Sequence, residues 1–340
     1  MSVDGGSAWG GGPMLERRAG PAPGPKEATG PRPRRRPGGR PLDIVTGAFG
    51  YTGRFITERL LAAGRGVRTL TGHPDRPNPF GDGLEVRPYR FDDVGAMAAS
   101  MEGASTLFNT YWVRFPRNGL GFEQAVANSA VLFEAAAKAG VGRIVHVSIT
   151  HPSVDSPFGY FRGKALVEDA LADAGVPHAV VRPTVIFGRG DVLVNNIAWL
   201  LRRFPAFPIA GDGSYQVRPV HVADVARLCV DAAAAENEVV VDAVGPETFT
   251  FAELVRAIAG AVGSCARLVT LPAAAVPPLA RVLGLAVRDV LLTPEELGGL
   301  MAGLVTTDGP PTGHVALTEW LAAYGSTLGT RYANELQRHY

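Results

Sequence analysis

The chain has 340 residues, of which 46% are hydrophobic and 19% charged, so it can bury a sizeable core as one large domain or as one domain with a smaller lobe. Its net charge is only +1, and the first 40 residues hold eight Lys and Arg against three Asp and Glu. The remaining chain is therefore mildly acidic, which argues against a nucleic-acid-binding surface.

The first 40 residues consist largely of glycine, proline and arginine, without a periodic apolar pattern. Such a segment cannot bury enough apolar surface to offset the entropy cost of ordering, so residues 1–40 are predicted to be a disordered tail. The arginine-rich stretch 32–36 is interpreted as a solvated charge block. An arm that binds nucleic acid or anionic lipid is the alternative.

From Leu42 onward, short apolar runs alternate with amphipathic stretches. Strands are predicted at residues 42–46, 67–70, 84–89, 106–109, 143–148 and 179–182. Helices are predicted at residues 53–63, 93–101, 122–139 and 159–174. Buried strands that alternate with helices indicate βαβ units and a parallel sheet, so the predicted fold class is doubly wound α/β.

The later part of the chain is less regular and is predicted to contribute a smaller, mostly helical substrate lobe. Helices are predicted at 191–203, 221–234 and 250–261, and a strand at 239–242. The stretch 268–287 is apolar but is interrupted by Pro272, Pro277, Pro278 and Arg281. It is too broken for a membrane helix and is interpreted as loop and short helices that line an apolar groove, with weak contact to a membrane surface as a minor alternative.

A glycine-rich turn directly follows the first predicted strand. A helix N-terminus presents unpaired N–H groups and the positive end of the helix dipole, which suits a pyrophosphate. Gly47 permits the tight turn, Gly50 lets the backbone approach the phosphates, and Gly53 lets the helix pack on the sheet. Because the turn lies between a strand and a helix, it predicts a dinucleotide-binding loop. Its expected contact residues are Thr46, Gly47, Phe49, Gly50, Tyr51, Thr52 and Gly53.

The residues after the second predicted strand bear on the choice between NAD and NADP. An acid at this place would bind the ribose hydroxyls, whereas a basic residue would pair with a 2′-phosphate. The expected acid position holds Thr71 or Gly72, and His73 and Arg76 follow closely. This favours NADP, and Asp75 keeps NAD open as the alternative.

Tyr160 and Lys164 are spaced four residues apart on a predicted helix, and Ser148 lies upstream at the end of a predicted strand. A tyrosine hydroxyl with its ordinary pKa near 10 is a poor base at neutral pH. A lysine one turn later lies on the same helix face, where its ammonium can stabilise the phenolate. Ser148 lies where parallel sheets bind ligands and can donate a hydrogen bond to a carbonyl oxygen.

Together, the glycine turn, Ser148 and the Tyr160-x-x-x-Lys164 motif resemble the short-chain dehydrogenase/reductase superfamily, whose fold is a Rossmann sheet. The segments that begin at Arg182-Pro183 and at Gly211-Asp212-Gly213 resemble its extended and atypical branches. Those branches include the accessory subunit of mitochondrial complex I and proteins of the NAD-dependent epimerase/dehydratase type. The resemblance implies a tail (1–40), a Rossmann domain (41–248) with a substrate-lobe insertion at about 188–216, and a C-terminal substrate lobe (249–340).

The resemblance also implies roles for single residues. Tyr160 would be the general acid and base, Lys164 its activator and ribose anchor, and Ser148 the group that polarises a carbonyl. Asn128 matches the helix asparagine that holds a proton-relay water. Further expected contacts are Asp92 with the adenine, Asn109 and Pro183 with the cofactor, and Arg218 with a substrate phosphate.

The chain departs from the superfamily after the fourth predicted strand, where Tyr111, Trp112 and Phe115 replace small residues. These side chains are either core or the wall of a substrate pocket, and they put the usual sugar substrate in doubt. The predicted function is an NAD(P)-dependent oxidoreductase, or an enzyme of the epimerase/dehydratase type, that acts at a carbonyl or carbinol carbon. A protein that binds NAD(P)H for a structural or redox-sensing role, without turnover, is the alternative.

The remaining expectations concern partners and location. Cys229 and Cys265 are both predicted to be buried free thiols in a reducing, cytoplasmic setting. No metal is expected, because no spacing typical of metal ligands is found among His73, His146, His151, His178 and His221. The expected partner is a small-molecule substrate, with no specific nucleic acid, no transmembrane segment, and a monomer or homodimer as the assembly.

Overall fold

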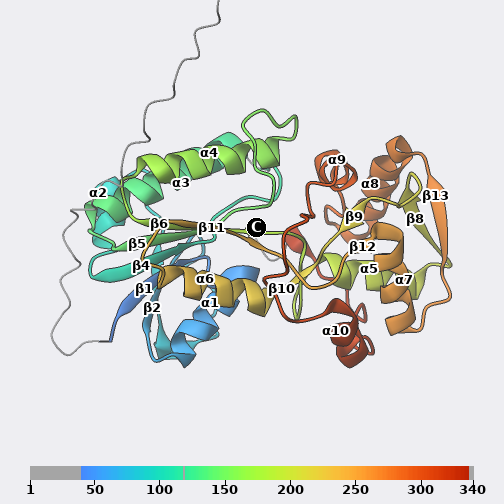
Figure 1. Cartoon of the computed structure of the whole chain (residues 1–340), viewed down its shortest axis with the longest axis horizontal. Coiled ribbons are helices and arrows are strands. Elements are labelled where there is room, and N and C mark those ends of the chain that lie inside the picture. Colours follow the sequence, from blue (N-terminus) through green and yellow to red (C-terminus); the bar gives the residue numbers. More distant parts are fainter. Residues whose placement is uncertain (1–39, 118, 337–340) are drawn as a thin grey trace, which may run out of the picture. The chain divides into compact units, whose positions relative to one another are not determined.

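The computed structural model describes residues 40–117 and 119–336. The predicted tail, including the arginine-rich stretch 32–36, falls outside these residues apart from Arg40. The described residues form a seven-stranded sheet in the order β11-β6-β5-β4-β1-β2-β3, in which all neighbouring strands are parallel (Figure 1). The doubly wound α/β fold is thereby confirmed. The strands are β1 (Leu42–Thr46), β2 (Gly66–Thr71), β3 (Leu84–Pro88), β4 (Ala104–Asn109), β5 (Arg143–Val147), β6 (His178–Pro183) and β11 (Val239–Ala243).

Helices cover both faces of this sheet. One face carries α2, α3 and α4, and the other carries α1 and α6 (Figure 1). The chain moves outward from β1 to β2 and β3 and then returns to place β4 on the other side of β1. This reversal opens a crevice at the carboxyl ends of β1 and β4, where such sheets bind ligands. The helices are α1 (Tyr51–Ala62), α2 (Val94–Ala99), α3 (Phe122–Lys138), α4 (Gly159–Asp173) and α6 (Val222–Ala233).

The central strands are buried on both faces, which explains their continuous apolar runs. All five residues of β5 are buried. Ile44 of β1 packs into the core under α2, α3 and α4, whereas its neighbour Val45 packs into the core under α1 and α6. This alternation follows from the two-residue period of a strand. The two apolar layers together hold the carboxyl ends of the strands in fixed register.

A second group of elements packs around two further apolar clusters, a large one and a small one that includes Val276. Its helices are α5 (Leu193–Arg203), α7 (Phe251–Val262), α8 (Val276–Val287), α9 (Pro294–Met301) and α10 (Leu317–Tyr324). It also contains two short strand pairs: β8 (Ala206–Ala210) with β13 (Arg267–Leu271), and β9 (Gln216–Val217) with β12 (Phe249–Thr250). A third pair, β7 (Ile186–Phe187) with β10 (Val220–His221), lies between this group and the main sheet. The Thr-x-x-Glu start of α7 is a complete capping box between Thr250 and Glu253.

The expected helices and strands of the main sheet are confirmed within a few residues. The first helix begins at Tyr51 rather than at Gly53, because the backbone is already helical inside the glycine turn. The interpretation of 268–287 as loop and short helices is wrong in part. This stretch contains most of β13 and the 12-residue helix α8, since Pro277 and Pro278 fall in the first turn of α8, where proline is tolerated.

None of the helices in the described part of the chain combines the length and the apolar character that crossing a membrane requires. Helix α8 exposes Val282 and Leu285 on its outer side. In the same described ranges, no group of three His, Cys, Asp or Glu side chains is arranged to hold a metal ion.

The prediction that both cysteines are buried is wrong for one of them. Cys229 is fully buried in α6, where burial raises the pKa of its thiol. Cys265 is exposed, because it lies in the short connection between α7 and β13. The two thiols therefore differ in reactivity, since attack on a reagent requires an accessible thiolate.

A thiol-reactive dye at pH 8 should label one cysteine of the native protein quickly and the second only after unfolding in urea. A Cys265→Ser variant should lose the fast phase and keep the slow one. Fast labelling of two thiols in the folded protein would contradict the burial of Cys229.

Candidate active site

The glycine turn has the geometry that its glycines predict. Gly47 has a φ of +67°, a conformation that side chains disfavour. The Gly50 N–H donates to the Gly47 carbonyl at 2.8 Å. A Cβ on Gly53 would collide with that same carbonyl oxygen. The first turn of α1 has no side-chain cap, so its N–H groups point to the crevice and can receive an anion.

A cavity of about 400 Å³ lies at the carboxyl ends of β1, β4, β5 and β6. It brings together ten of the residues predicted from the sequence for the cofactor, catalysis or substrate. These are Gly47, Gly50, Tyr51, Thr52, Tyr111, Trp112, Ser148, Tyr160, Lys164 and Pro183. The glycine turn and the Tyr-x-x-x-Lys motif, more than 100 residues apart in the chain, thus face one cavity.

Lys164 is buried at this cavity and makes no ion pair with a carboxylate within the described ranges. Its ammonium donates to the Val147 carbonyl at 2.9 Å and lies 4.7 Å from the centre of the Trp112 ring. Glu168, one helical turn further on, is instead held by Arg182. Burial lowers the pKa of Lys164 to about 7, against a weaker opposing effect of Glu168.

Ser148 and Tyr160 complete the group. The Ser148 hydroxyl is buried and has no hydrogen-bond partner among the residues that the structure describes. Burial raises the pKa of Tyr160, and the negative charge of Glu296 raises it further. Tyr160 therefore holds its proton at neutral pH and suits proton donation. A buried hydroxyl without a partner, like that of Ser148, is rare in proteins unless a ligand forms the missing hydrogen bond.

The aromatic residues after β4 form a wall of the cavity. The Trp112 ring stacks on Phe122 at 5.9 Å, and its edge meets Tyr160 at 5.8 Å. A Cβ on Gly163 would lie 2.7 Å from the Trp112 ring, so α4 must carry glycine there. The sequence left open whether these aromatic residues belong to the core or to a pocket wall. Trp112 and Tyr111 line the cavity, whereas Phe115 is buried and lines a neighbouring cavity.

Asn128 and Asn109 lie behind this wall. The Asn128 amide donates to the Tyr111 hydroxyl at 2.7 Å and accepts from Gln124 at 2.9 Å. Asn109 is buried and bonds with Thr46 and with the ring of His146. Neither asparagine lines the cavity. A water held by Asn128 and a direct contact of Asn109 with a cofactor therefore stay predictions.

A second cavity of about 1080 Å³ adjoins the first. Five residues line both: Gly50, Tyr51, Ile149, Tyr160 and Ile186. The larger cavity also takes in Phe49 and Arg76 among the predicted residues. Tyr160 therefore lies where the two cavities meet.

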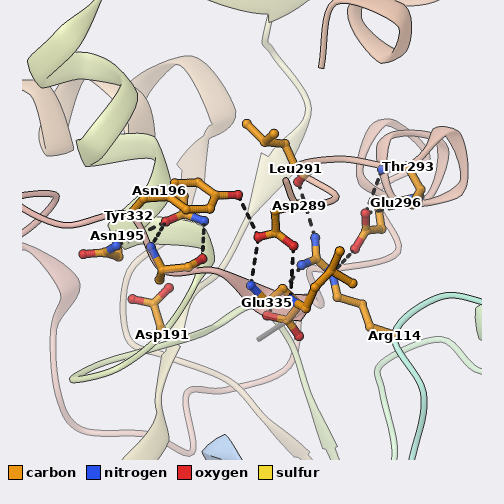
Figure 2. Close-up of polar contacts among 12 residues, drawn as sticks. Arg114, Asp191, Asn195, Asn196, Asp289, Leu291, Thr293, Glu296, Tyr332 and Glu335 are labelled. Atoms are coloured by element: carbon orange, nitrogen blue, oxygen red, sulfur yellow. Dashed lines mark hydrogen bonds and ion pairs between the residues drawn. The ribbon is translucent and has the colours of Figure 1, made fainter. Parts of the chain in front are cut away.

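Arg114 connects the wall of the larger cavity to the last part of the chain (Figure 2). Its guanidinium donates to Glu296 at 2.5 Å and lies 3.7 Å from a Glu335 oxygen. Asp289 accepts hydrogen bonds from the Tyr332 hydroxyl and from the backbone N–H of Glu335, both at 2.8 Å. These carboxylates raise the pKa of Arg114 against the opposing effect of burial.

No sequence pattern predicts this network. Arg114 and Glu335 belong to no motif. About 180 residues separate Arg114 from Glu296, and about 40 separate Glu296 from Glu335. Glu295 was missed as well: its side chain accepts from the Gly159 N–H at 3.3 Å, at the first residue of the helix that carries Tyr160. Only the Thr293-x-x-Glu296 spacing of a capping box could have marked this segment, and it marks a helix start rather than a site.

The structure does not bring every predicted residue to the cavities. His73, Asp75 and Asp92 are exposed and line neither cavity, and Thr46 and Gly53 support the turn from behind. The Arg218 guanidinium donates to the backbone carbonyls of Gly245, Thr307 and Gly309. Because those bonds occupy it within the protein, the structure offers no support for Arg218 as a phosphate ligand.

The lowered pKa of Lys164 predicts how stability changes with pH. The folded pKa near 7 lies below the ordinary value of 10.5, so between these values the unfolded state binds more protons. The free energy of unfolding should then rise with pH, by about 1 kcal/mol per pH unit near pH 8. Urea denaturation of the ligand-free protein between pH 7.5 and about 8.5 measures this slope.

A Lys164→Met variant should lose the slope, and a Lys138→Met variant, altered at an exposed lysine of α3, should keep it. An equal slope in both variants would show that Lys164 is not the titrating group.

Comparison with known proteins shows which family the chain belongs to. A family model described as NAD(P)H-binding matches residues 47–236. Subunit 9 of the NADH dehydrogenase [ubiquinone] 1 alpha subcomplex, mitochondrial, from Arabidopsis thaliana is 29% identical over 239 residues, which are 67% of this chain and 60% of that protein. The chain therefore spans less than two thirds of the length of this plant relative.

A protein from Caulobacter vibrioides named ceramide reductase is 29% identical over 238 residues, which are 68% of this chain and 74% of that protein. Among solved structures, the triphenylmethane reductase of a Citrobacter species, complexed with NADP(H), has a TM-score of 0.68 at 17% identity. The likeness covers 83% of this chain and 99% of that one, and at this identity it concerns the fold alone. Since the family model covers more than half of its residues, the chain belongs to the NAD(P)H-binding family.

Proposed function

We propose that the protein is an NAD(P)H-dependent oxidoreductase that reduces a carbonyl group, or oxidises a carbinol, through Ser148, Tyr160 and Lys164. The observation that carries this proposal is the shared lining of the 400 Å³ cavity, which joins the glycine turn to those three side chains. The fit to a dinucleotide rests on the close approach of Gly53 to Gly47 and on the uncapped start of α1. When bound, the nicotinamide supplies or accepts a hydride at the substrate carbon.

The three side chains divide the work of proton transfer. Tyr160 stays protonated at neutral pH and donates its proton to the carbonyl oxygen during reduction. Ser148 holds that oxygen by a hydrogen bond from its hydroxyl, which has no partner among the described residues. Lys164, when charged, lowers the cost of the phenolate that Tyr160 leaves behind and supplies a donor for the nicotinamide ribose. The same groups serve an epimerase or dehydratase that oxidises its substrate transiently.

Burial makes these interactions strong. The stacked rings of Trp112 and Phe122 both meet the Tyr160 ring edge-on, at 5.8 and 6.0 Å between ring centres. Charges interact more strongly where water is excluded. Burial raises the pKa of Tyr160, Glu296 and Glu335 raise it further, and the charge of Arg114 opposes them.

NADP is the favoured cofactor. Arg76 lines the larger cavity next to the glycine turn, whereas Asp75 lines neither cavity and is exposed. A guanidinium at the end of the second strand suits the 2′-phosphate that distinguishes NADP. Complexes of similar folds with NADP(H) and with NAD are both known, so the fold itself does not decide.

The second candidate is a protein that binds NAD(P)H without turnover. The observation that favours it is the packing of Trp112 over both Lys164 and Tyr160, which narrows access to the two groups. The similarity to a complex I subunit agrees with it. The two candidates differ in one respect: only the enzyme needs the hydroxyl of Tyr160.

A Tyr160→Phe variant tests the choice. Loss of a general acid typically lowers the rate by about 100-fold or more, while cofactor affinity should stay within about twofold of wild type. NADPH and NADH are titrated by fluorescence, and reduction of carbonyl compounds is followed with the tighter cofactor. Tyr324→Phe, at an exposed tyrosine of α10, is the matched control and should behave as wild type.

Two outcomes would contradict the enzymatic proposal. Tight cofactor binding with no Tyr160-dependent turnover of any carbonyl compound would favour the structural or sensing role. Failure to bind either cofactor would overturn both candidates.

The glycine turn gives a separate prediction for cofactor binding. A Gly53→Ala variant forces the new methyl group onto the Gly47 carbonyl, so NADPH affinity should fall at least about tenfold, which equals about 1.4 kcal/mol. Gly260→Ala, in α7, is the control because nothing lies within 4 Å of its added Cβ. Unchanged NADPH affinity in a folded Gly53→Ala protein would place the cofactor elsewhere.

A further inference from the structure

The 1080 Å³ cavity is walled mainly by apolar side chains. They come from α5, β8, α7, α8 and α9, so distant parts of the chain contribute to one surface. Representative lining residues are Ile197, Leu200, Phe207, Leu254, Leu283 and Leu297. The volume exceeds the range of about 300–1,000 Å³ that is typical of small-molecule sites.

Several polar groups in this wall are engaged within the protein, whereas the buried hydroxyl of Tyr215 has no hydrogen-bond partner among the described residues. Asn196 exchanges two hydrogen bonds with the backbone of Ala333, both at 2.9 Å. Asp191 accepts from the Val194 N–H at 2.8 Å, at the start of α5. Arg114 is held by Glu296 and Glu335 (Figure 2). A ligand with many hydroxyl groups would therefore leave several of them unpaired against an apolar wall, which is costly.

The junction of the two cavities fixes which end of a ligand reacts. Tyr160 lines both cavities, and Ser148 lines the smaller one. A carbonyl group that meets both hydroxyls directs its remaining atoms into the larger cavity. Arg189, also in that lining, is exposed.

We propose that the part of the larger cavity lined by α5, β8, α7, α8 and α9 binds a long unbranched hydrocarbon chain, and that the substrate is a long-chain aliphatic carbonyl compound. This rests on the proposed function. The part of the cavity beside the glycine turn, with Arg76, is left to the cofactor. In the reduction, a hydride from the reduced nicotinamide forms a C–H bond at the carbonyl carbon while the C=O π bond breaks. The electron pair passes to oxygen, which takes the proton of Tyr160, and the nicotinamide is oxidised.

A homologous series of 2-alkanones from four to twelve carbons tests the proposal. Each methylene moved from water into the cavity should raise affinity about fourfold, which corresponds to about 0.8 kcal/mol. Binding is measured by calorimetry on the Tyr160→Phe protein with NADP⁺ present, so that it does not depend on turnover. The dissociation constant should fall stepwise with chain length and level off once the cavity is filled.

Two variants of α8 test where the chain lies. Ala280 lines the cavity, and Ala286 is exposed on the same helix. Ala280→Phe fills part of the space and should move the levelling-off to shorter chains, with at least tenfold weaker binding of the twelve-carbon ketone. Ala286→Phe, an identical change outside the cavity, should leave the whole series unchanged.

Affinity that is independent of chain length, or equal effects of the two phenylalanine variants, would overturn the proposal. So would binding of UDP-glucose, used as the polar probe, more tightly than the twelve-carbon ketone. Chain-length-dependent binding without turnover in wild type would instead count against the proposed function and leave the hydrocarbon site standing.

Discussion

The site depends on the buried ammonium group of Lys164, which has no carboxylate partner among the residues that the structure describes. Lys164 lies in α4 against the end of β5, where its ammonium donates to the Val147 carbonyl and lies 4.7 Å from the centre of the Trp112 ring. The nearest acid on its own helix, Glu168, is held by Arg182. A cation in this position is costly to bury, and the protein responds with a pKa near 7. Such a cost is typical of functional sites, where a ligand completes what the protein leaves unpaired.

The elements that surround Lys164 hold the rest of the site. Ser148 directly follows Val147 at the carboxyl end of β5, and Tyr160 lies one helical turn before Lys164 in α4. The glycine turn brings the start of α1 to the same cavity. The C-terminal part of the chain then closes the second cavity: Glu295 caps the start of α4, and Gly299 of α9 packs so closely on Phe161 that an added Cβ would lie 2.7 Å from its ring.

The sequence predicted the local and periodic features well. The Gly47–Gly53 turn, the strands of the sheet and the Tyr160/Lys164 spacing all depend on residues close together in the chain, which is why pattern and position sufficed. Contacts between distant residues could not be predicted in this way. Three features depend on how the last part of the chain folds. They are the hydrogen bonds of Arg218 to backbone carbonyls, the exposure of Cys265 and the Arg114–Glu296–Glu335 network.

The most direct test of the account follows the hydrogen itself. NADPH that carries deuterium at C4 of the nicotinamide, with both faces labelled, is mixed with the protein and 2-dodecanone, and the alcohol is examined by mass spectrometry. The account predicts one deuterium per product molecule, bound to the carbinol carbon. Bound NADPH that delivers no deuterium to this ketone, or to shorter and longer members of the series, would contradict a site in which Tyr160 joins a cofactor cavity to a hydrocarbon cavity.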